Sequence, residues 1–440
     1  MIKKLVLVFI VIFAIKGHSQ QSTVSPYSYY GIGNLNFKGT VENRSMGGLS
    51  IYNDSIHVNL RNPASFGGEN LASWGGKSRP VKYTVGGSYQ STTLKSETDK
   101  GKTSSTTFNY LAMSFPIGKL GFGVGIMPYS SVGYKLDNLN DDGNLGNRFR
   151  GEGGINKVFL GVGYQLLSGL SVGADVQYNF GNIQNSIIAF QYDGEIPTQY
   201  QTREDNRSDL SGVNFNLGVS YKRMLTERLE LVSGLTYTAQ SNLHSVNERS
   251  FSTIVINSNT GVESALNTIE DNLENKGLKE TDLTLPSRIT FGVGIGQPRS
   301  WFLGAEYMAQ NTSEFGNPLY DNTGAEYENS SRLSFGGFLI PQYNSFSNYF
   351  KRVVYRGGLR MEKSGLNIND ESIKEFGISF GAGLPVGDNR LFSNANLGLE
   401  FGKRGTTESN LIQENFINFQ ISLSLNDRWF QRESTINRLK

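Results

Sequence analysis

Most of the chain after residue 81 alternates between apolar residues and small polar residues. In the stretch 170–180, one face would carry Leu170, Val172, Ala174, Val176, Tyr178 and Phe180, and the other face Ser171, Gly173, Asp175, Gln177 and Asn179. The stretches 213–222 and 417–425 follow the same pattern. A period of two with one wholly apolar face predicts β-strands. The chain is therefore expected to be an all-β protein.

The composition of the second face separates a transmembrane barrel from a soluble sandwich. This face is rich in Gly, Asn, Ser and Gln rather than in Lys and Glu, and charged residues are only 18% of the chain. Transmembrane barrels have apolar residues outside, polar residues inside and aromatic residues at the membrane interfaces. The predicted strand ends carry Tyr164, Tyr178, Tyr221, Tyr237 and Phe401. The pattern favours an antiparallel transmembrane β-barrel over a secreted soluble β protein.

About 14 strands can be counted. They are predicted at 81–94, 105–117, 119–136, 148–167, 169–192, 207–224, 227–250, 278–297, 300–315, 328–340, 350–364, 371–385, 390–405 and 411–426. Short turns alternate with longer polar loops, as periplasmic turns and external loops do in outer-membrane barrels. The connection from Pro341 to Tyr349 is longer than this rule predicts. The longest external loop, 251–277, could hold a short helix at 265–275.

The N-terminus resembles a secretory signal peptide at residues 1–19. Lys3 and Lys4 precede an apolar run from Leu5 to Ile15, and small residues follow it. The run is too short for a membrane-spanning helix. We therefore expect a barrel at 81–427 in the outer membrane and a periplasmic tail at 428–440.

Residues 20–80 differ from the strands and are expected to form a hatch, or plug, in the barrel. The stretch 45–66 is polar and interrupted by Gly and Asn. Asn62, Pro63 and Ala64 predict a helix start, with Asn62 as N-cap and Pro63 at the first helical position.

Few residues could support chemistry. The Gly-rich runs 121–125 and 292–296 lie inside predicted strands, so they are not expected to bind phosphate. The mature chain keeps two isolated histidines, His57 and His244, and has no cysteine. The net charge of +2 does not favour a nucleic-acid partner. No enzyme activity, cofactor or metal site is therefore expected.

The third predicted strand contains Pro128 near its centre, with Gly133 beyond it. Proline has no backbone N–H to donate to a sheet, so it indicates an edge, a bulge or a break in the strand. A break would open a gap in the barrel wall. A simple bulge is the alternative.

The plug stretch with Met46-Gly47-Gly48 and Asn62-Pro63-Ala64, the strand with Pro128 and the strand count together resemble the FadL-type outer-membrane barrels, including the PorV-like branch associated with type IX secretion. This resemblance covers the mature chain. It implies a hatch containing Asn62, Pro63 and Ala64, and a lateral opening marked by Pro128 and Gly133. It also implies contact with outer-membrane lipid and passage of a hydrophobic small molecule. The alternative function is a non-transporting subunit of an outer-membrane complex for type IX secretion or barrel assembly.

Overall fold

The computed structural model describes residues 23–68, 80–257, 259–316, 319, 324–386 and 393–427. The expected signal peptide and the C-terminal tail lie outside these residues. Among the described residues, no helix is long and apolar enough to cross a membrane.

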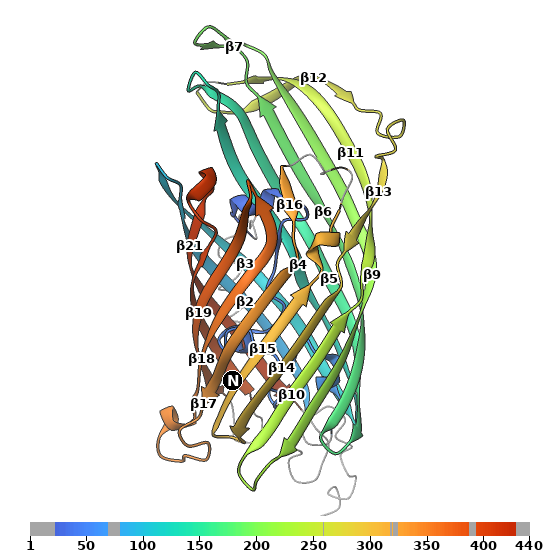
Figure 1. Cartoon of the computed structure of the whole chain (residues 1–440), viewed down its shortest axis with the longest axis vertical. Coiled ribbons are helices and arrows are strands. Elements are labelled where there is room, and N and C mark those ends of the chain that lie inside the picture. Colours follow the sequence, from blue (N-terminus) through green and yellow to red (C-terminus); the bar gives the residue numbers. More distant parts are fainter. Residues whose placement is uncertain are drawn as a thin grey trace, which may run out of the picture.

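The described strands form one closed antiparallel barrel with 14 strand positions around its wall (Figure 1). Two of these positions are each filled by two shorter strands in succession. One consists of β10 followed by β11, and the other of β13 followed by β14. Pairing of β2 (Val81–Lys95) with β21 (Gln413–Asp427) closes the barrel. The other barrel strands are β3 (Lys100–Ile117), β4 (Leu120–Leu139), β5 (Leu145–Leu167), β6 (Leu170–Ala189), β9 (Gln201–Met224), β10 (Glu230–Thr238), β11 (Ser241–Ile256), β13 (Glu280–Leu285), β14 (Arg288–Gln297), β15 (Trp301–Gln310), β17 (Ser330–Leu339), β18 (Val354–Ile368), β19 (Glu371–Val386) and β20 (Ser393–Arg404).

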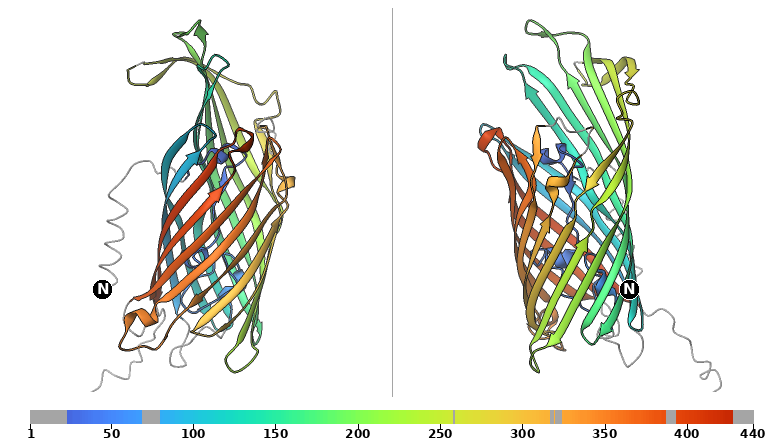
Figure 2. Two further views of the ribbon diagram at one scale, coloured as in Figure 1. Left: turned by 60° about the vertical axis from the view of Figure 1, so that its left-hand side comes forward. Right: turned by 45° about the vertical axis from the view of Figure 1, so that its right-hand side comes forward.

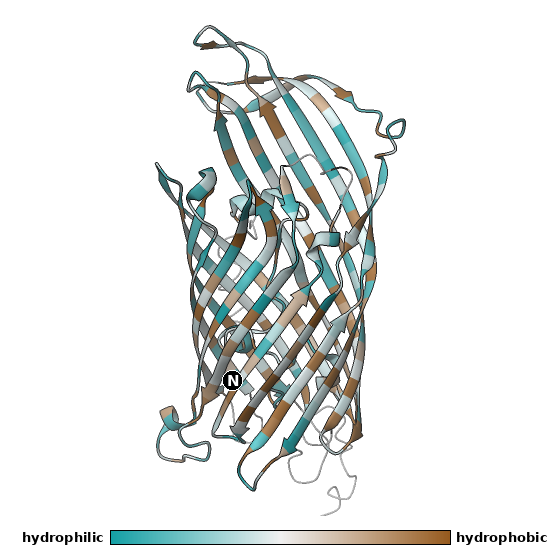
Figure 3. Ribbon diagram, in the orientation of Figure 1, coloured by the Kyte–Doolittle hydropathy of each residue, from teal (hydrophilic) through white to brown (hydrophobic). Residues whose placement is uncertain are grey.

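The alternation along each strand separates the two faces of the wall. On β6 and β9, Val176, Tyr178 and Phe215 are exposed outside the barrel. Their neighbours Gln177 and Asn214 are buried inside it. Figure 3 shows the resulting bands of hydrophobic residues along the strands. An apolar exterior and a polar interior are the pattern of a barrel in lipid, which confirms the predicted fold class.

The barrel wall is much taller on one side. Strands β4, β5, β6 and β9 have 20 to 24 residues, whereas β14, β15 and β17 have 10. The tall wall rises above the rest of the barrel and ends in β12 (Glu263–Glu270) and the hairpin of β7 (Tyr192–Asp193) and β8 (Ile196–Pro197) (Figure 2). We call this the long-loop end and the opposite one the short-turn end.

Several predicted elements are corrected. The helix expected at 265–275 is wrong, because Glu263–Glu270 forms β12 and pairs with the end of β11. Pairing with the free edge of β11 outweighs the weak local helix preference of this stretch. The predicted strand 227–250 is interrupted after Thr238, and the predicted strand 278–297 is interrupted at Pro286, which cannot donate to the sheet.

The connection between β17 and β18 is the exception to the short turns at its end. It runs from Ile340 to Val353 and contains the 3-10 helix η5 (Tyr349–Arg352). The turns from β3 to β4 and from β5 to β6 contain only residues 118–119 and 168–169. The irregularity that the sequence indicated at Pro341–Tyr349 is therefore present.

Candidate functional site in the barrel lumen

The N-terminal segment, residues 23–68, lies inside the barrel (Figures 1 and 2). It contains η1 (Pro26–Tyr29), β1 (Asn34–Leu35), α2 (Val41–Arg44) and η2 (Pro63–Phe66). We call residues 41–68 the plug and residues 29–36 the seal. The plug lies against both sides of the lumen, and the seal lies beside strand β4.

The motif Asn62-Pro63-Ala64 fixes one end of the plug to β5, β6 and β9. Asn62 caps η2, because its Oδ1 accepts a hydrogen bond from the Ala64 amide at 3.0 Å. Its Nδ2 donates to the carbonyl oxygen of Val219 at 2.9 Å. A Cβ at Gly173 would lie 2.4 Å from the carbonyl carbon of Pro63. Glycine in the wall therefore allows the plug backbone to contact the strand directly.

The motif Met46-Gly47-Gly48 fixes the other end of the plug to β17, β18 and β19. The Gly47 amide donates to Ser379 Oγ at 2.9 Å. A Cβ at Gly358 would lie 2.2 Å from the Gly47 nitrogen, and one at Gly336 would lie 2.3 Å from the Met46 oxygen. Gly47 itself has φ of 69°, which favours glycine. Both ends of the plug thus dock on glycines of the barrel wall.

A buried ion network joins the plug to β18, β19 and β20. Arg44 of α2 pairs with Glu400 at 2.5 Å. Arg360 donates to Glu400 at 2.7 Å and to Glu375 at 2.5 Å. Arg404 continues the network to Glu375. Each charge has a partner of opposite sign, as buried ions require.

The opposite side of the lumen contains a cluster of three cationic side chains, Lys38, Lys157 and Arg288, that the sequence did not indicate. Lys38 is buried, and its Nζ lies 4.2 Å from the centre of the Tyr129 ring. Within the described residues, this ammonium makes no hydrogen bond or ion pair. Burial lowers the pKa of Lys38 well below its usual value, and the nearby cations Arg288 and Lys157 lower it further. These residues are far apart in the sequence, so no local motif identifies them.

A cavity of about 1170 Å³ lies at the short-turn end of the plug and is lined by both polar and apolar side chains. There, Asp54 Oδ2 lies 2.6 Å from His57 Nδ1. Lys82 Nζ donates to the carbonyl oxygens of both residues, at 2.8 and 2.9 Å. Burial disfavours the charged form of His57, but the Asp54 and Glu42 carboxylates outweigh it and raise the His57 pKa. Burial also disfavours ionised Asp54, but His57 and Lys82 hold its pKa well below the usual range.

The wall separates between β3 and β4. These strands pair only between Leu111–Ile117 and Leu120–Ile126. Past that point β3 pairs with β2, and β4 pairs with β5 after a register shift between Pro128 and Ser130. Pro128 therefore lies where β4 leaves β3. Gly133 lies farther along β4, opposite Glu152.

The seal occupies this gap. Asn34 and Leu35 of β1 pair antiparallel with Ser131 and Ser130. The Asn36 amide donates to the Tyr129 carbonyl oxygen at 2.9 Å, and Asn36 Nδ2 donates to Ser131 Oγ at 2.8 Å. A segment of the N-terminal region thus contributes backbone hydrogen bonds where β3 does not.

Gly133 allows the N-terminal segment to approach β4 beside the seal. Its amide donates to Ser28 Oγ at 3.1 Å. A Cβ at this position would lie 2.0 Å from the Thr23 oxygen. The two predicted groups thus lie in different places: Asn62–Ala64 on β5, β6 and β9, and Pro128 with Gly133 on β4.

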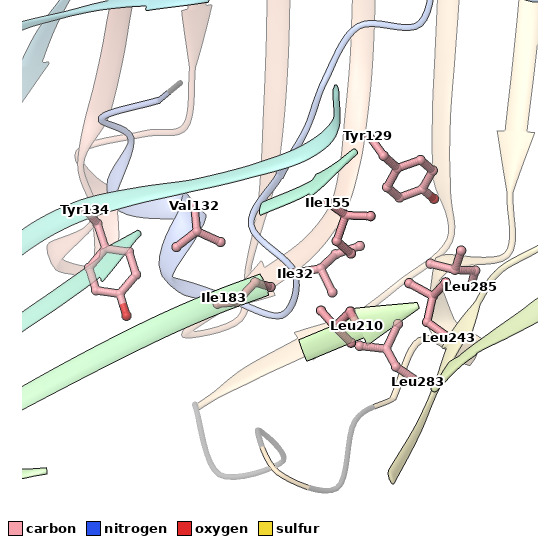
Figure 4. Packing of buried hydrophobic residues seen from close by; sticks show 10 residues of the cluster. All are labelled: Ile32, Tyr129, Val132, Tyr134, Ile155, Ile183, Leu210, Leu243, Leu283 and Leu285. Atoms are coloured by element: carbon pink, nitrogen blue, oxygen red, sulfur yellow. The ribbon is translucent and has the colours of Figure 1, made fainter. Parts of the chain in front are cut away.

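An apolar cluster includes Ile32 of the seal and side chains of the surrounding barrel strands (Figure 4). It consists of Ile32, Tyr129, Val132, Tyr134, Ile155, Ile183, Leu210, Leu243, Leu283 and Leu285. A cavity of about 120 Å³ adjoins it and is lined in part by Tyr30, Leu35 and Phe315. The strand alternation could not reveal this cluster, because it predicts a polar lumen.

Comparisons with solved structures find the same fold in toluene transporters and in a FadL homologue. The toluene transporter TbuX of Ralstonia pickettii is 16% identical, with a TM-score of 0.56 over 89% of this chain and 100% of that one. The Pseudomonas putida toluene transporter TodX is 16% identical, with a TM-score of 0.58 over 90% and 99%. A Pseudomonas aeruginosa FadL homologue is 12% identical, with a TM-score of 0.56 over 90% and 98%. At these identities, the similarity shows a shared fold.

Sequence comparison gives the family. No curated protein matches the chain. The BamG family model matches residues 1–437, nearly the whole chain. The protein therefore belongs to the BamG family and has the barrel fold of the FadL-type channels.

Proposed function

We propose that this protein is an outer-membrane barrel that binds a hydrophobic small molecule behind the seal and releases it sideways between β3 and β4. The observation that carries this proposal is the gap in the wall, which is occupied by β1 and lined inside by the apolar cluster. Two of the solved structures with this fold are described as toluene transporters. The short-turn end would face the periplasm, as in other barrels of this type.

The plug favours the sideways route over a straight one. Met46–Gly48 and Asn62–Phe66 contact the backbone on two sides of the lumen, so clearing the axis requires the loss of both sets of contacts. Opening the gap requires that β1 and Asn36 leave β4 and that Ile32 leave the apolar cluster, while both sets of plug contacts remain. A straight route would also bring an apolar molecule past the charged residues Asp54, Lys82 and Arg356, which line part of the cavity below the plug. The route does not use a catalytic group, so we propose no enzymatic activity.

Pro128 provides a test of the gap. In Pro128→Val the backbone regains an N–H, and the β-branched side chain favours a regular strand. We expect slower uptake of radiolabelled toluene by cells that depend on this barrel. Pro116→Val is the matched control, because Pro116 lies on β3 where it pairs with β4. Unchanged toluene uptake in Pro128→Val would contradict the sideways route.

A second candidate function is a fixed subunit of an outer-membrane assembly. Two observations favour it: the match to the BamG family model, and the extension of the tall wall and the β17–β18 connection beyond the rest of the barrel. Affinity purification of the tagged protein from native outer membranes tests it. A stoichiometric protein complex would support this function, and a lone barrel with bound lipid would contradict it.

A further inference from the structure

We infer that the β17–β18 connection, residues 340–353, is a docking element for a protein partner that presents an apolar pocket bordered by carboxylates. This inference rests on the second proposed function, membership of an outer-membrane assembly. The connection carries two aromatic side chains that are strongly exposed. Phe346 is 97% exposed and Phe350 is 69% exposed.

The connection is held in one conformation although its aromatic residues are exposed. The Ile340 amide donates to the Ser300 carbonyl oxygen at 2.6 Å, and the Gln342 amide donates to the Lys351 carbonyl oxygen at 2.8 Å. Asn348 caps η5 by accepting from the Phe350 amide at 3.0 Å. A partner would therefore meet preformed aromatic groups, and little ordering entropy would oppose binding.

The base of the connection is anchored to neighbouring strands. The Tyr349 hydroxyl donates to the Pro385 carbonyl oxygen of β19 at 3.0 Å. The Tyr355 hydroxyl of β18 donates to the Phe350 carbonyl oxygen at 3.2 Å. Figure 1 shows η5 beyond the end of β17, at the bottom of the barrel. The connection therefore projects from the short-turn end, which would face the periplasm.

Charge identifies the chemistry of the partner. The connection contains Lys351 and Arg352 and no acidic residue. Arg299 of the adjacent turn lies 5.3 Å from the centre of the Tyr343 ring and adds another cation. Exposed aromatic residues with flanking cations complement an apolar pocket bordered by acidic residues. A phospholipid surface is the competing occupant, and the experiment distinguishes the two.

The first test is photo-crosslinking in intact cells that make the full-length protein. Benzoylphenylalanine replaces Phe346, and in a matched control it replaces Ile196, which is 72% exposed at the long-loop end. We expect position 346 to form one protein adduct of defined mass that position 196 does not form. Adducts with phospholipid alone, or no adduct at position 346, would overturn the inference.

Charge reversal tests whether carboxylates border the partner's pocket. Lys351→Glu with Arg299→Glu should reduce the adduct at position 346 about tenfold or more, while the barrel keeps its heat-modifiable migration. An adduct of undiminished yield would overturn the acidic-pocket partner.

Purification from native membranes tests the docking element and the assembly function separately. If the wild-type protein carries no stoichiometric partner, the assembly function fails. If it carries one, Phe346→Ala with Phe350→Ala should reduce partner recovery about tenfold or more, as loss of buried aromatic anchors does. Full recovery in this double variant would overturn the docking element and leave the assembly function standing.

Discussion

The plug and the seal belong to one N-terminal segment, but the barrel holds them in different ways. The plug contacts glycine backbones on two sides of the lumen and joins a buried ion network. The seal is held by a two-residue strand on β4, by the contacts of Asn36 and by Ile32, which packs in the apolar cluster, and it has no ion pair like that of Arg44. Buried Lys38, without an ionic partner in the described structure, lies two residues beyond the seal. If the proposed sideways route is correct, the seal leaves its site while the plug stays docked.

The largest effect is expected when the ion network beside the plug is broken. Arg360→Met leaves Glu375 and Glu400 short of a buried partner, so the free energy of unfolding should fall by about 3–5 kcal/mol. Urea unfolding in detergent micelles measures this change. A loss below about 1 kcal/mol would show that the network does not secure this wall and the plug.

Lys38→Met should stabilise the protein locally, in contrast to Arg360→Met. Lys38 has a lowered pKa because burial and neighbouring cations disfavour its charge. Because an apolar side chain fills this buried site without the cost of a charge, the substitution should slow amide exchange in residues 32–38. Hydrogen exchange in detergent measures it. Faster exchange would mean that the charge of Lys38 holds the seal in place.

Two asparagines allow a direct comparison of plug and seal. Asn62→Ala removes an N-cap and a contact with the wall, so docking of η2 should weaken by about 1 kcal/mol. Asn36→Ala removes one side-chain hydrogen bond and keeps the backbone bond, so the seal should lose about 0.5 kcal/mol. Amide exchange in each segment measures both changes. Equal losses would remove the energetic difference between the two regions.

The smallest effect is expected from pH at the short-turn end of the plug. The folded pKa of His57 is raised, so the charged ring stabilises residues 53–58 fully below the unfolded value of about 6.5. This contribution is lost as pH rises through the folded pKa, while Asp54 stays ionised because its pKa is lowered. Exchange corrected for intrinsic pH dependence should therefore speed up as the pH rises. His57→Gln should show no such transition.

Local signals in the sequence predicted the strands and the cap at Asn62. Alternation reports which face meets lipid, and Asn-Pro fixes a helix start through its own side chain and ring. Pro128 predicted an irregularity because it has no N–H to donate. The grouping of Lys38 with Arg288 and the pairing of β12 with β11 depend on contacts between distant residues. No local pattern could show that β1 fills the gap.

A reversible disulfide between the seal and β4 tests whether the seal must leave β4 for a ligand to exit. Leu35 and Ser130 are direct partners in the β1–β4 register, and the chain has no cysteine of its own. Opposed positions on antiparallel strands lie within disulfide reach, so Leu35→Cys with Ser130→Cys should join the seal to β4 under oxidation.

Toluene uptake by cells carrying this double variant is the decisive measurement. Each single cysteine variant serves as a control for the substitution alone. If the seal must leave β4, uptake should stop in the oxidised double variant and return to the level of the single variants after reduction. Uptake that continues at the same rate with the disulfide formed would contradict this requirement.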